Sequence, residues 1–303
     1  MSSPKAPEAE IIPGESVVRR PARALVGWLS KQEGANFILG RNPAPTEDVS
    51  AEISLAARYA ESVAARPAYE PQDPRVKDER FDDLLEEVAN RPEVIANFHN
   101  LAWKPAIVDL RKVLSFQKII FTDHEGGYDD SSTVSNLMEV CLPSQQPAPP
   151  SGAIGDHDGK GFTISSLNSN LRIVGGRLGE AHLSPGPGLP ASVRVQAVTI
   201  FVSMGTSYLQ VVRYRDRYFL RDGYHRAGRL IRKGITTVPC IYIEASSFDE
   251  MQVPPGALSY EILYSDHPPT LTDFWDESVS MEVSQLAIRK VIRIRGEEFA
   301  VPR

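Results

Sequence analysis

The chain has few cysteines and lacks any long apolar run. Cys141 and Cys240 are its only two cysteines, and they lie far apart in the sequence. Two isolated thiols make neither a disulfide framework nor a zinc site, so we expect a reducing, cytoplasmic location. No stretch reaches the 18 apolar residues that a membrane-spanning helix requires. The first ten residues are acidic and have no apolar centre, so we expect no secretory signal.

An excess of basic charge is also missing. The formal net charge is −6, which argues against general affinity for nucleic acid. The distribution is uneven, however, because residues 211–233 hold eight basic and two acidic side chains. Such a run is often only a solvated surface. Here it coincides with a strand–helix motif that favours anions, so we prefer a phosphate-rich partner.

That motif extends from residue 210 to residue 243. The pattern predicts a strand that ends in a polar turn (210–217), a second short strand (218–221), a glycine break (222–223), a helix (224–233) and an apolar strand (238–243). In this order the N-terminus of the helix points out of the end of a sheet.

A helix N-terminus in this position suits an anion. Its first N–H groups have no partner within the helix, and the helix dipole adds positive charge there. Gly223 allows close approach to the backbone, while His225 and Arg226 add side-chain donors. The simpler alternative makes Asp222 only a helix cap and His225 only a surface residue.

The run Tyr-Phe-Leu-Arg-Asp-Gly-Tyr-His-Arg-Ala at 218–227, followed by Lys-Gly-Ile-Thr-Thr-Val-Pro at 233–239, resembles the signature of the ParB/sulfiredoxin superfamily. Residues 106–117 resemble the opening strand of that family. The resemblance implies an α+β fold with a mixed sheet and a nucleotide site, with Mg²⁺ accompanying the nucleotide. The phosphate-binding residues that it implies are Gly223, Tyr224, His225, Arg226 and Arg221.

The sequence departs from the family's motif at positions that decide which of the family's reactions we expect. Tyr224 stands where sulfiredoxins have their catalytic cysteine, so repair of sulfinic acids by that route is not expected. The Gly-Glu-Arg-Arg form of the partition proteins is also absent. The motif is closer to members that act as free-serine kinases, nucleotide hydrolases or parts of DNA-modification systems. The resemblance therefore implies His225, Asp222 and Asp123 as catalytic residues, with Glu125 as a second candidate acid.

Three functional hypotheses follow from these residues. The first is an enzyme that hydrolyses a nucleoside triphosphate or transfers its phosphoryl group to a small acceptor. The second is a switch in which a bound nucleotide controls homodimer formation or DNA contact with little turnover. The third is a degenerate module that binds only a protein.

Composition and periodicity also divide the chain. We expect a disordered tail at 1–14, a helical region at 15–103, the ParB/sulfiredoxin-like core at 104–246 with a long insertion at about 122–190, and an extension at 247–303. Helices are predicted at 21–34, 50–65, from 78, from 91 and at 280–288. Core strands are predicted at 113–121 and 193–204, and a hairpin from 291–295 and 299–301.

Two acidic–histidine pairs lie within the insertion. Asp123-His124 and Asp156-His157-Asp158 contain residue types that bind metals. Neither has a further ligand at helical or hairpin spacing, so we interpret both as turn residues and predict no protein metal site.

The charge balance yields a prediction about DNA. No helix-turn-helix pattern follows the motif, so we expect weak contact that is insensitive to sequence and lost at moderate salt. Gel-shift titrations at two salt concentrations test this expectation. Tight binding to one defined sequence at physiological salt would contradict it.

Overall fold

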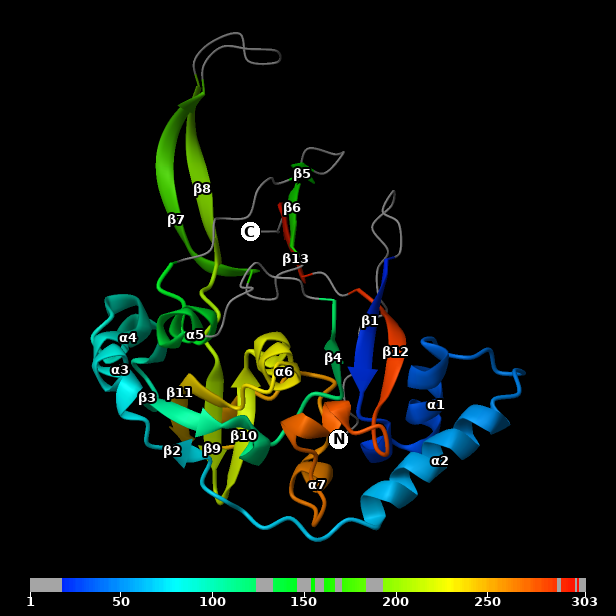
Figure 1. The fold of residues 1–303 in the computed structure, drawn as a ribbon. Helices are drawn as coiled ribbons and strands as arrows, with labels where there is room; N and C mark the ends of the chain where they lie inside the picture. The colour runs from blue at the N-terminus through cyan, green and yellow to red at the C-terminus, as the bar shows by residue number, and fades with distance from the viewer. Residues whose placement is uncertain are drawn as a thin grey trace.

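A computed structural model describes residues 18–123, 133–145, 154–155, 161–166, 171–183, 193–287, 290–297 and 299. Within this part of the chain the fold is a mixture of helices and several sheets (Figure 1). The predicted α+β class is therefore confirmed. None of the helices in the described ranges is both long enough and apolar enough to cross a membrane.

A five-stranded sheet forms the centre. Its strand order is β10-β9-β11-β3-β2, with bounds Arg217–Asp222, Gln210–Tyr214, Thr237–Ala245, Ala102–Asp109 and Arg75–Val76. The hairpin β9–β10 leads into helix α6 (Tyr224–Arg232), which crosses over to β11. As a result β11 pairs with β9 in parallel, whereas the other pairs are antiparallel. The predicted hairpin, helix and strand are confirmed.

Further helices surround this sheet. They are α3 (Asp82–Ala89), α4 (Pro92–Phe98), α5 (Val134–Cys141) and α7 (Tyr260–Leu263). Helix α3 packs on β3 and α5 packs on β11. Large apolar side chains fill the space between the layers, and Phe116, Phe219 and Leu209 are completely buried. The helices predicted from residues 78 and 91 correspond to α3 and α4.

A second sheet joins distant parts of the chain. Its order is β12-β1-β4, with bounds Met281–Leu286, Arg19–Ala24 and Ile119–Phe121. Helices α1 (Lys31–Leu39) and α2 (Ser50–Ala64) pack together beside it. Because β1 pairs with β12, the first described strand and a strand near the C-terminus belong to one sheet. The predicted helix at 50–65 is confirmed.

The same sheet overturns two predicted helices. Residues 21–34 begin as strand β1 and a short 3-10 turn, Val26–Trp28, and become helical only from Lys31. Residues 280–288 contain strand β12. Both predictions were wrong because strand pairing between distant segments overrides weak local propensity. Ala22, Ala24 and Val283 are buried against each other and point to the same face.

The strand predicted at 113–121 is also shorter than expected. Only Ile119–Phe121 forms a strand. Leu114 instead makes single bridges to Phe219 and Thr270, and its N–H donates to the Tyr218 carbonyl at 2.8 Å. Other backbone groups of this segment bind separate loops, such as the Ser115 N–H, which donates to the Pro269 carbonyl at 2.9 Å, so the segment is hydrogen-bonded without a continuous ladder.

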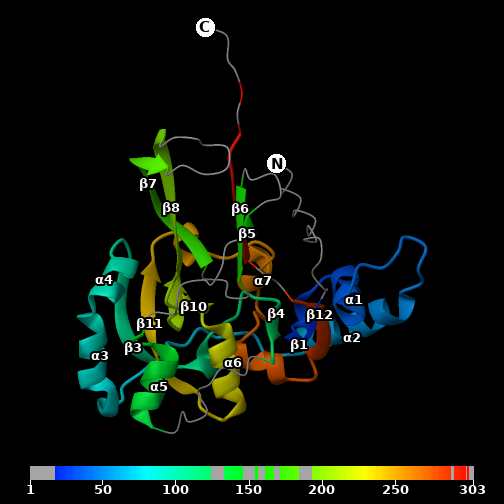
Figure 2. The same cartoon turned by 90° about the horizontal axis from the view of Figure 1, so that it is seen from above.

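Most of the predicted insertion and the strand that follows it build the upper part of the molecule, whereas α5 of the insertion packs on the central sheet. The upper part contains β5 (Ile154–Gly155), β6 (Gly161–Ser166) and β7 (Leu171–Leu183) from the insertion and β8 (Val193–Met204) after it. Strands β7 and β8 form a hairpin that projects from the body in two perpendicular views (Figures 1 and 2). Residues 193–204 are thus a strand, as predicted, but the prediction that they belong to the core was wrong.

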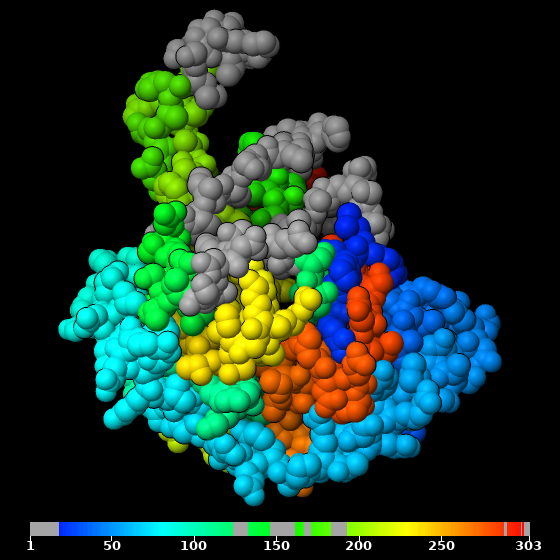
Figure 3. All heavy atoms as spheres, in the orientation of Figure 1, coloured from blue at the N-terminus to red at the C-terminus, as the bar shows by residue number. Residues whose placement is uncertain are grey.

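The C-terminal strand β13 (Lys290–Arg295) pairs with β6 of the insertion. The strand predicted at 291–295 is confirmed, whereas most of the second strand of its predicted hairpin, 299–301, lies outside the described residues. The predicted tail at 1–14 also lies outside them. In the space-filling view the hairpin extends far beyond the surface formed by α5 and α6 (Figure 3).

Candidate functional site

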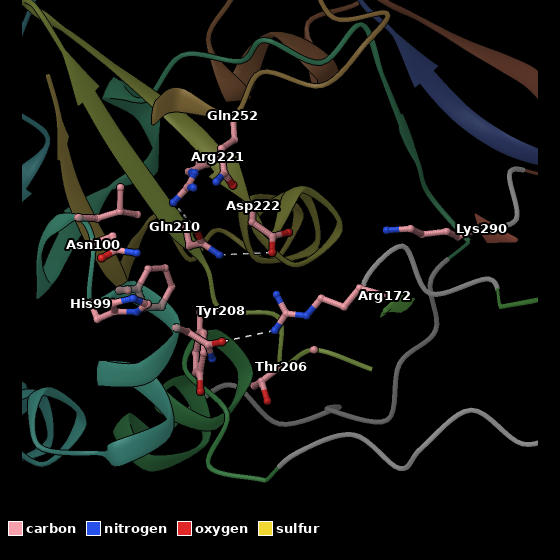
Figure 4. Close-up of a pocket in the computed structure, with 14 residues that line it drawn as sticks. His99, Asn100, Arg172, Thr206, Tyr208, Gln210, Arg221, Asp222, Gln252 and Lys290 are labelled. Atoms are coloured by element: carbon pink, nitrogen blue, oxygen red, sulfur yellow. Dashed lines mark hydrogen bonds between the residues drawn. The ribbon is translucent and has the colours of Figure 1, made fainter. Parts of the chain in front are cut away.

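A pocket of about 440 Å³ opens at the end of the β9–β10 hairpin. Five separate parts of the chain line it: the end of α4, the root of the β7–β8 hairpin, β9–β10, the segment after β11 and the start of β13 (Figure 4). The lining residues are Asn97, Phe98, His99, Asn100, Leu101, Arg172, Gly205, Thr206, Tyr208, Gln210, Arg221, Asp222, Gln252 and Lys290.

The pocket is basic. Arg172, Arg221 and Lys290 line it together with a single carboxylate, that of Asp222. Arg221 and Asp222 come from strand β10, whereas Arg172 and Lys290 enter from the opposite side (Figure 4). Cations on opposite walls of a concave site raise the positive electrostatic potential in the space between them. The pocket is therefore suited to an anion.

Arg221 is the most distinctive of these cations. Its Nη1 donates to Gln210 Oε1 at 3.2 Å, but its Nε is buried and has no hydrogen-bond partner in the described structure. Burial lowers the pKa of Arg221, and the negative charges of Asp222 and Glu250 oppose this effect. A buried donor without an acceptor is costly, so an anionic ligand would supply what this side chain lacks.

Asp222 occupies the break between β10 and α6. Its Oδ1 accepts from the Gly223 N–H at 2.6 Å and its Oδ2 from Ser207 Oγ at 3.1 Å. The residue at the N-cap of α6 is Gly223, and no side chain caps this helix end. Asp222 is therefore not the N-cap of α6, and its carboxylate binds the Gly223 N–H and Ser207 Oγ instead.

Gly223 has a conformation that few other residues adopt. Its φ is +94°, and an added Cβ would lie 3.1 Å from Leu209 Cα. A side chain here would be strained and would also collide with the backbone of the neighbouring strand. This glycine thus allows the chain to turn from β10 into α6 directly beside the pocket.

Tyr224 is a core residue and does not line the pocket. It is buried, its hydroxyl donates to the Leu220 carbonyl at 2.6 Å, and the same oxygen accepts from Phe116 N–H at 3.1 Å. Burial raises the pKa of this phenol. The Tyr224 side chain therefore holds α6 against the sheet, and a direct contact of its ring with a nucleotide in this pocket is not supported.

Arg226 is directed toward the backbone of the protein. Its Nη1 donates to the carbonyls of Ser207 at 2.6 Å and Val140 at 3.2 Å, and its Nη2 donates to Ser207 Oγ at 2.6 Å. These bonds connect α6 to α5 and to the segment between β8 and β9. In this arrangement Arg226 shapes the pocket through Ser207, and its guanidinium does not line the cavity.

His225 and Asp123 lie on the side of α6 that faces β4. His225 Nδ1 is 3.0 Å from the Phe121 carbonyl, and Asp123 forms an ion pair with Arg20 at 2.6 Å. Neither residue lines the pocket that contains Arg221 and Asp222. The predicted catalytic set is therefore divided between two sides of the helix. Glu125 lies outside the described residues.

Sequence reasoning missed several lining residues. Arg172 and Lys290 were assigned to an insertion and an extension, and no local pattern indicated that they meet. Gln252 has a φ of +52°, which is unusual for a residue other than glycine. Strained conformations of this kind cluster at functional sites, but the sequence contains no sign of this one.

The side chains offer little support for a resident metal or for thiol chemistry. No group of three or more His, Cys, Asp or Glu side chains able to hold a metal occurs among the described residues. Asp222 could supply one ligand to Mg²⁺, which proteins often bind through one carboxylate together with substrate phosphates. Burial raises the pKa of Cys141 to about 12 and also raises that of Cys240. Neither thiol is therefore an activated nucleophile.

Comparison with protein-family models, curated proteins and solved structures finds no match to this chain. The resemblance to the ParB/sulfiredoxin superfamily therefore stays a hypothesis that depends on the motif at 218–239.

The two bonds of the Tyr224 hydroxyl predict a measurable stability loss. Tyr224→Phe leaves the buried Phe116 N–H without an acceptor, which should cost about 1–3 kcal/mol of unfolding free energy. Urea denaturation monitored by circular dichroism would measure it. Tyr260→Phe is the control. Because Tyr260 is 38% exposed, this variant should lose little unfolding free energy. Equal stability of wild type and Tyr224→Phe would contradict this role.

Proposed function

We propose that the pocket binds a nucleotide, and that the protein hydrolyses or transfers a phosphoryl group of this ligand. The observation that carries the proposal is Arg221, a partly buried guanidinium with a buried Nε that lacks an acceptor. A phosphate oxygen is a suitable acceptor, because arginine binds phosphate with charge-assisted hydrogen bonds. Arg172 and Lys290 provide further positive charge across the pocket.

Size and polarity support a ligand of nucleotide dimensions. A volume of about 440 Å³ lies within the range of small-molecule pockets, about 300–1,000 Å³. The amide side chains of Asn97, Asn100, Gln210 and Gln252 line the same space. Amides offer both donors and acceptors, so they suit the edge of a base or the hydroxyl groups of a sugar.

In the enzymatic hypothesis Asp222 and the basic residues have different tasks. Arg221, Arg172 and Lys290 hold the phosphates and stabilise the charge that develops during phosphoryl transfer. Asp222 accepts the proton of the attacking water or hydroxyl group, or supplies one ligand to the Mg²⁺ that accompanies the nucleotide. His225 stays a candidate for a second group, on the far side of α6.

One observation favours the alternative of a nucleotide-gated switch. Arg172 belongs to the root of the β7–β8 hairpin, and Lys290 begins the strand that pairs with β6. A ligand held between these residues and Arg221 would connect the upper part of the molecule to the central sheet. Such a ligand could therefore change the position of the upper part without being consumed.

The binding hypothesis predicts a loss of affinity in Arg221→Gln. Removing hydrogen bonds worth about 1.5–3 kcal/mol should weaken nucleotide or pyrophosphate binding roughly 10- to 150-fold. Thermal-shift titrations measure this loss, because a ligand at a hundred times its Kd raises stability by about 2.7 kcal/mol. Arg213→Gln, on the neighbouring strand and outside the pocket lining, is the matched control. An unchanged titration with Arg221→Gln would move the site elsewhere.

Measurements of phosphate release distinguish catalysis in the described pocket from catalysis on the side of α6 that faces β4. In Asp222→Asn the side-chain oxygen still accepts from Gly223, so we expect near wild-type stability, but phosphate release should fall at least about tenfold because the charge is lost. His225→Ala should reduce turnover less if catalysis belongs to the described pocket. The opposite ranking would place catalysis beside β4. No release by wild type with any of the four nucleotides would favour the switch.

A further inference from the structure

The projecting hairpin exposes apolar side chains along its length. Strand β7 has 13 residues and β8 has 12, and they form a two-stranded sheet. Both of its outer edges lack a ladder partner among the described strands. An isolated two-stranded ribbon is only marginally stable in water, and a third or fourth strand or a packed face is normally required. The hairpin thus has the form of a surface that a partner covers.

One face of the hairpin carries its two most exposed aliphatic side chains. Leu178 and Val198 are directly paired and are 70% and 69% exposed. Because side chains alternate along a strand, Ile200 lies on the same face toward the root, at 36% exposure. Ile173, at 54% exposure, joins this face because a bulge between Ile173 and Gly175 brings it into register with Val202. The opposite face has Gly175, Gly179, Ala197 and Arg177 in the corresponding stretch, together with Phe201, which is 44% exposed and has the Arg177 guanidinium 5.8 Å from its ring centroid. We call the first of these the Leu178 face.

We propose that the Leu178 face binds the Leu178 face of a second copy of this chain, independently of the proposed nucleotide chemistry. The face is apolar near its root and charged toward its tip, where Glu180 pairs with Arg194 at 2.5 Å. Antiparallel stacking would place apolar residues on charged ones. A two-fold axis parallel to the hairpin instead places apolar residues on apolar residues and charged residues on charged residues, so we favour this arrangement.

The two-fold axis also gives complementary charges. It places β7 of one copy over β8 of the other, so Leu178 packs on Val198 of the second copy. At the tip Glu180 then lies near Arg194 of the second copy as well as near its own Arg194. Opposite charges meet across the interface twice. Ile173 packs on Val202 of the second copy, and Ile200 lies over Gly176 of that copy. Both features are expected of an isologous interface.

The size of the face sets the expected affinity. With a rise of about 3.4 Å per residue and a strand spacing of about 4.8 Å, the ribbon presents roughly 400 Å² per copy. The resulting total of about 800 Å² is below the standard interface size of about 1,200–2,000 Å². Interfaces of this small size belong to weak, transient complexes, so we expect reversible association with a Kd on the order of 10–100 µM.

Sedimentation velocity over a wide concentration range tests the proposal. Wild type should pass from monomer to dimer, whereas Leu178→Glu should stay monomeric at every concentration. Thr199→Glu, on the opposite face beside Val198, is the matched control and should dimerise like wild type. A wild type that stays monomeric at about 200 µM, above the expected Kd, would assign the face to a different partner and overturn the proposal. Equal loss in both variants would also overturn it.

Cysteine cross-linking tests the orientation. Both native thiols are buried, so an introduced surface cysteine is the reactive one. A mixture of Leu178→Cys and Val198→Cys should form disulfide-linked heterodimers under mild oxidation, in higher yield than either variant alone. Thr199→Cys mixed with Leu178→Cys should not. Equal yields in the two mixtures would contradict the predicted stacking, and a normal melting temperature of each variant excludes misfolding as the cause.

Discussion

The joint between β10 and α6 is the constraint on which the rest of the site depends. Gly223 takes a left-handed conformation, so the chain leaves the strand and starts a helix within one residue. The Tyr224 hydroxyl then binds two backbone groups of different segments, the Leu220 carbonyl and the Phe116 N–H. This joint fixes the helix against the sheet and leaves Arg221 and Asp222 facing outward together.

The pocket beside this joint is assembled from parts that are distant in sequence. Its inner wall belongs to the central sheet, where pairing and burial hold the backbone in place. Its outer wall comes from the hairpin root and the C-terminal strand, which are themselves paired with elements of the insertion. Both walls carry cationic side chains, Arg221 on the inner wall and Arg172 and Lys290 on the outer one, so an anion between them offsets the repulsion of these cations.

The upper part of the molecule exposes apolar side chains of the kind that the core buries. Phe219 and Phe116 are fully buried in the core, whereas Leu178 and Val198 are mostly exposed on the hairpin. Exposed apolar side chains of this size mark contact surfaces when they gather on one face. The hairpin and the pocket meet at Arg172, so a ligand and a second copy would act on the same strand.

The sequence by itself determined the local units. Alternating apolar residues and the Asp-Gly break were sufficient to predict β9, β10, α6 and β11, because each depends on short-range periodicity and turn chemistry. Only the tertiary structure decided that Ala22 and Val283 pair in one sheet, that Arg226 binds carbonyls and that Arg172 and Lys290 meet Arg221. Those outcomes depend on contacts between segments that are separated in the sequence by other strands or helices, and no local pattern encodes such contacts.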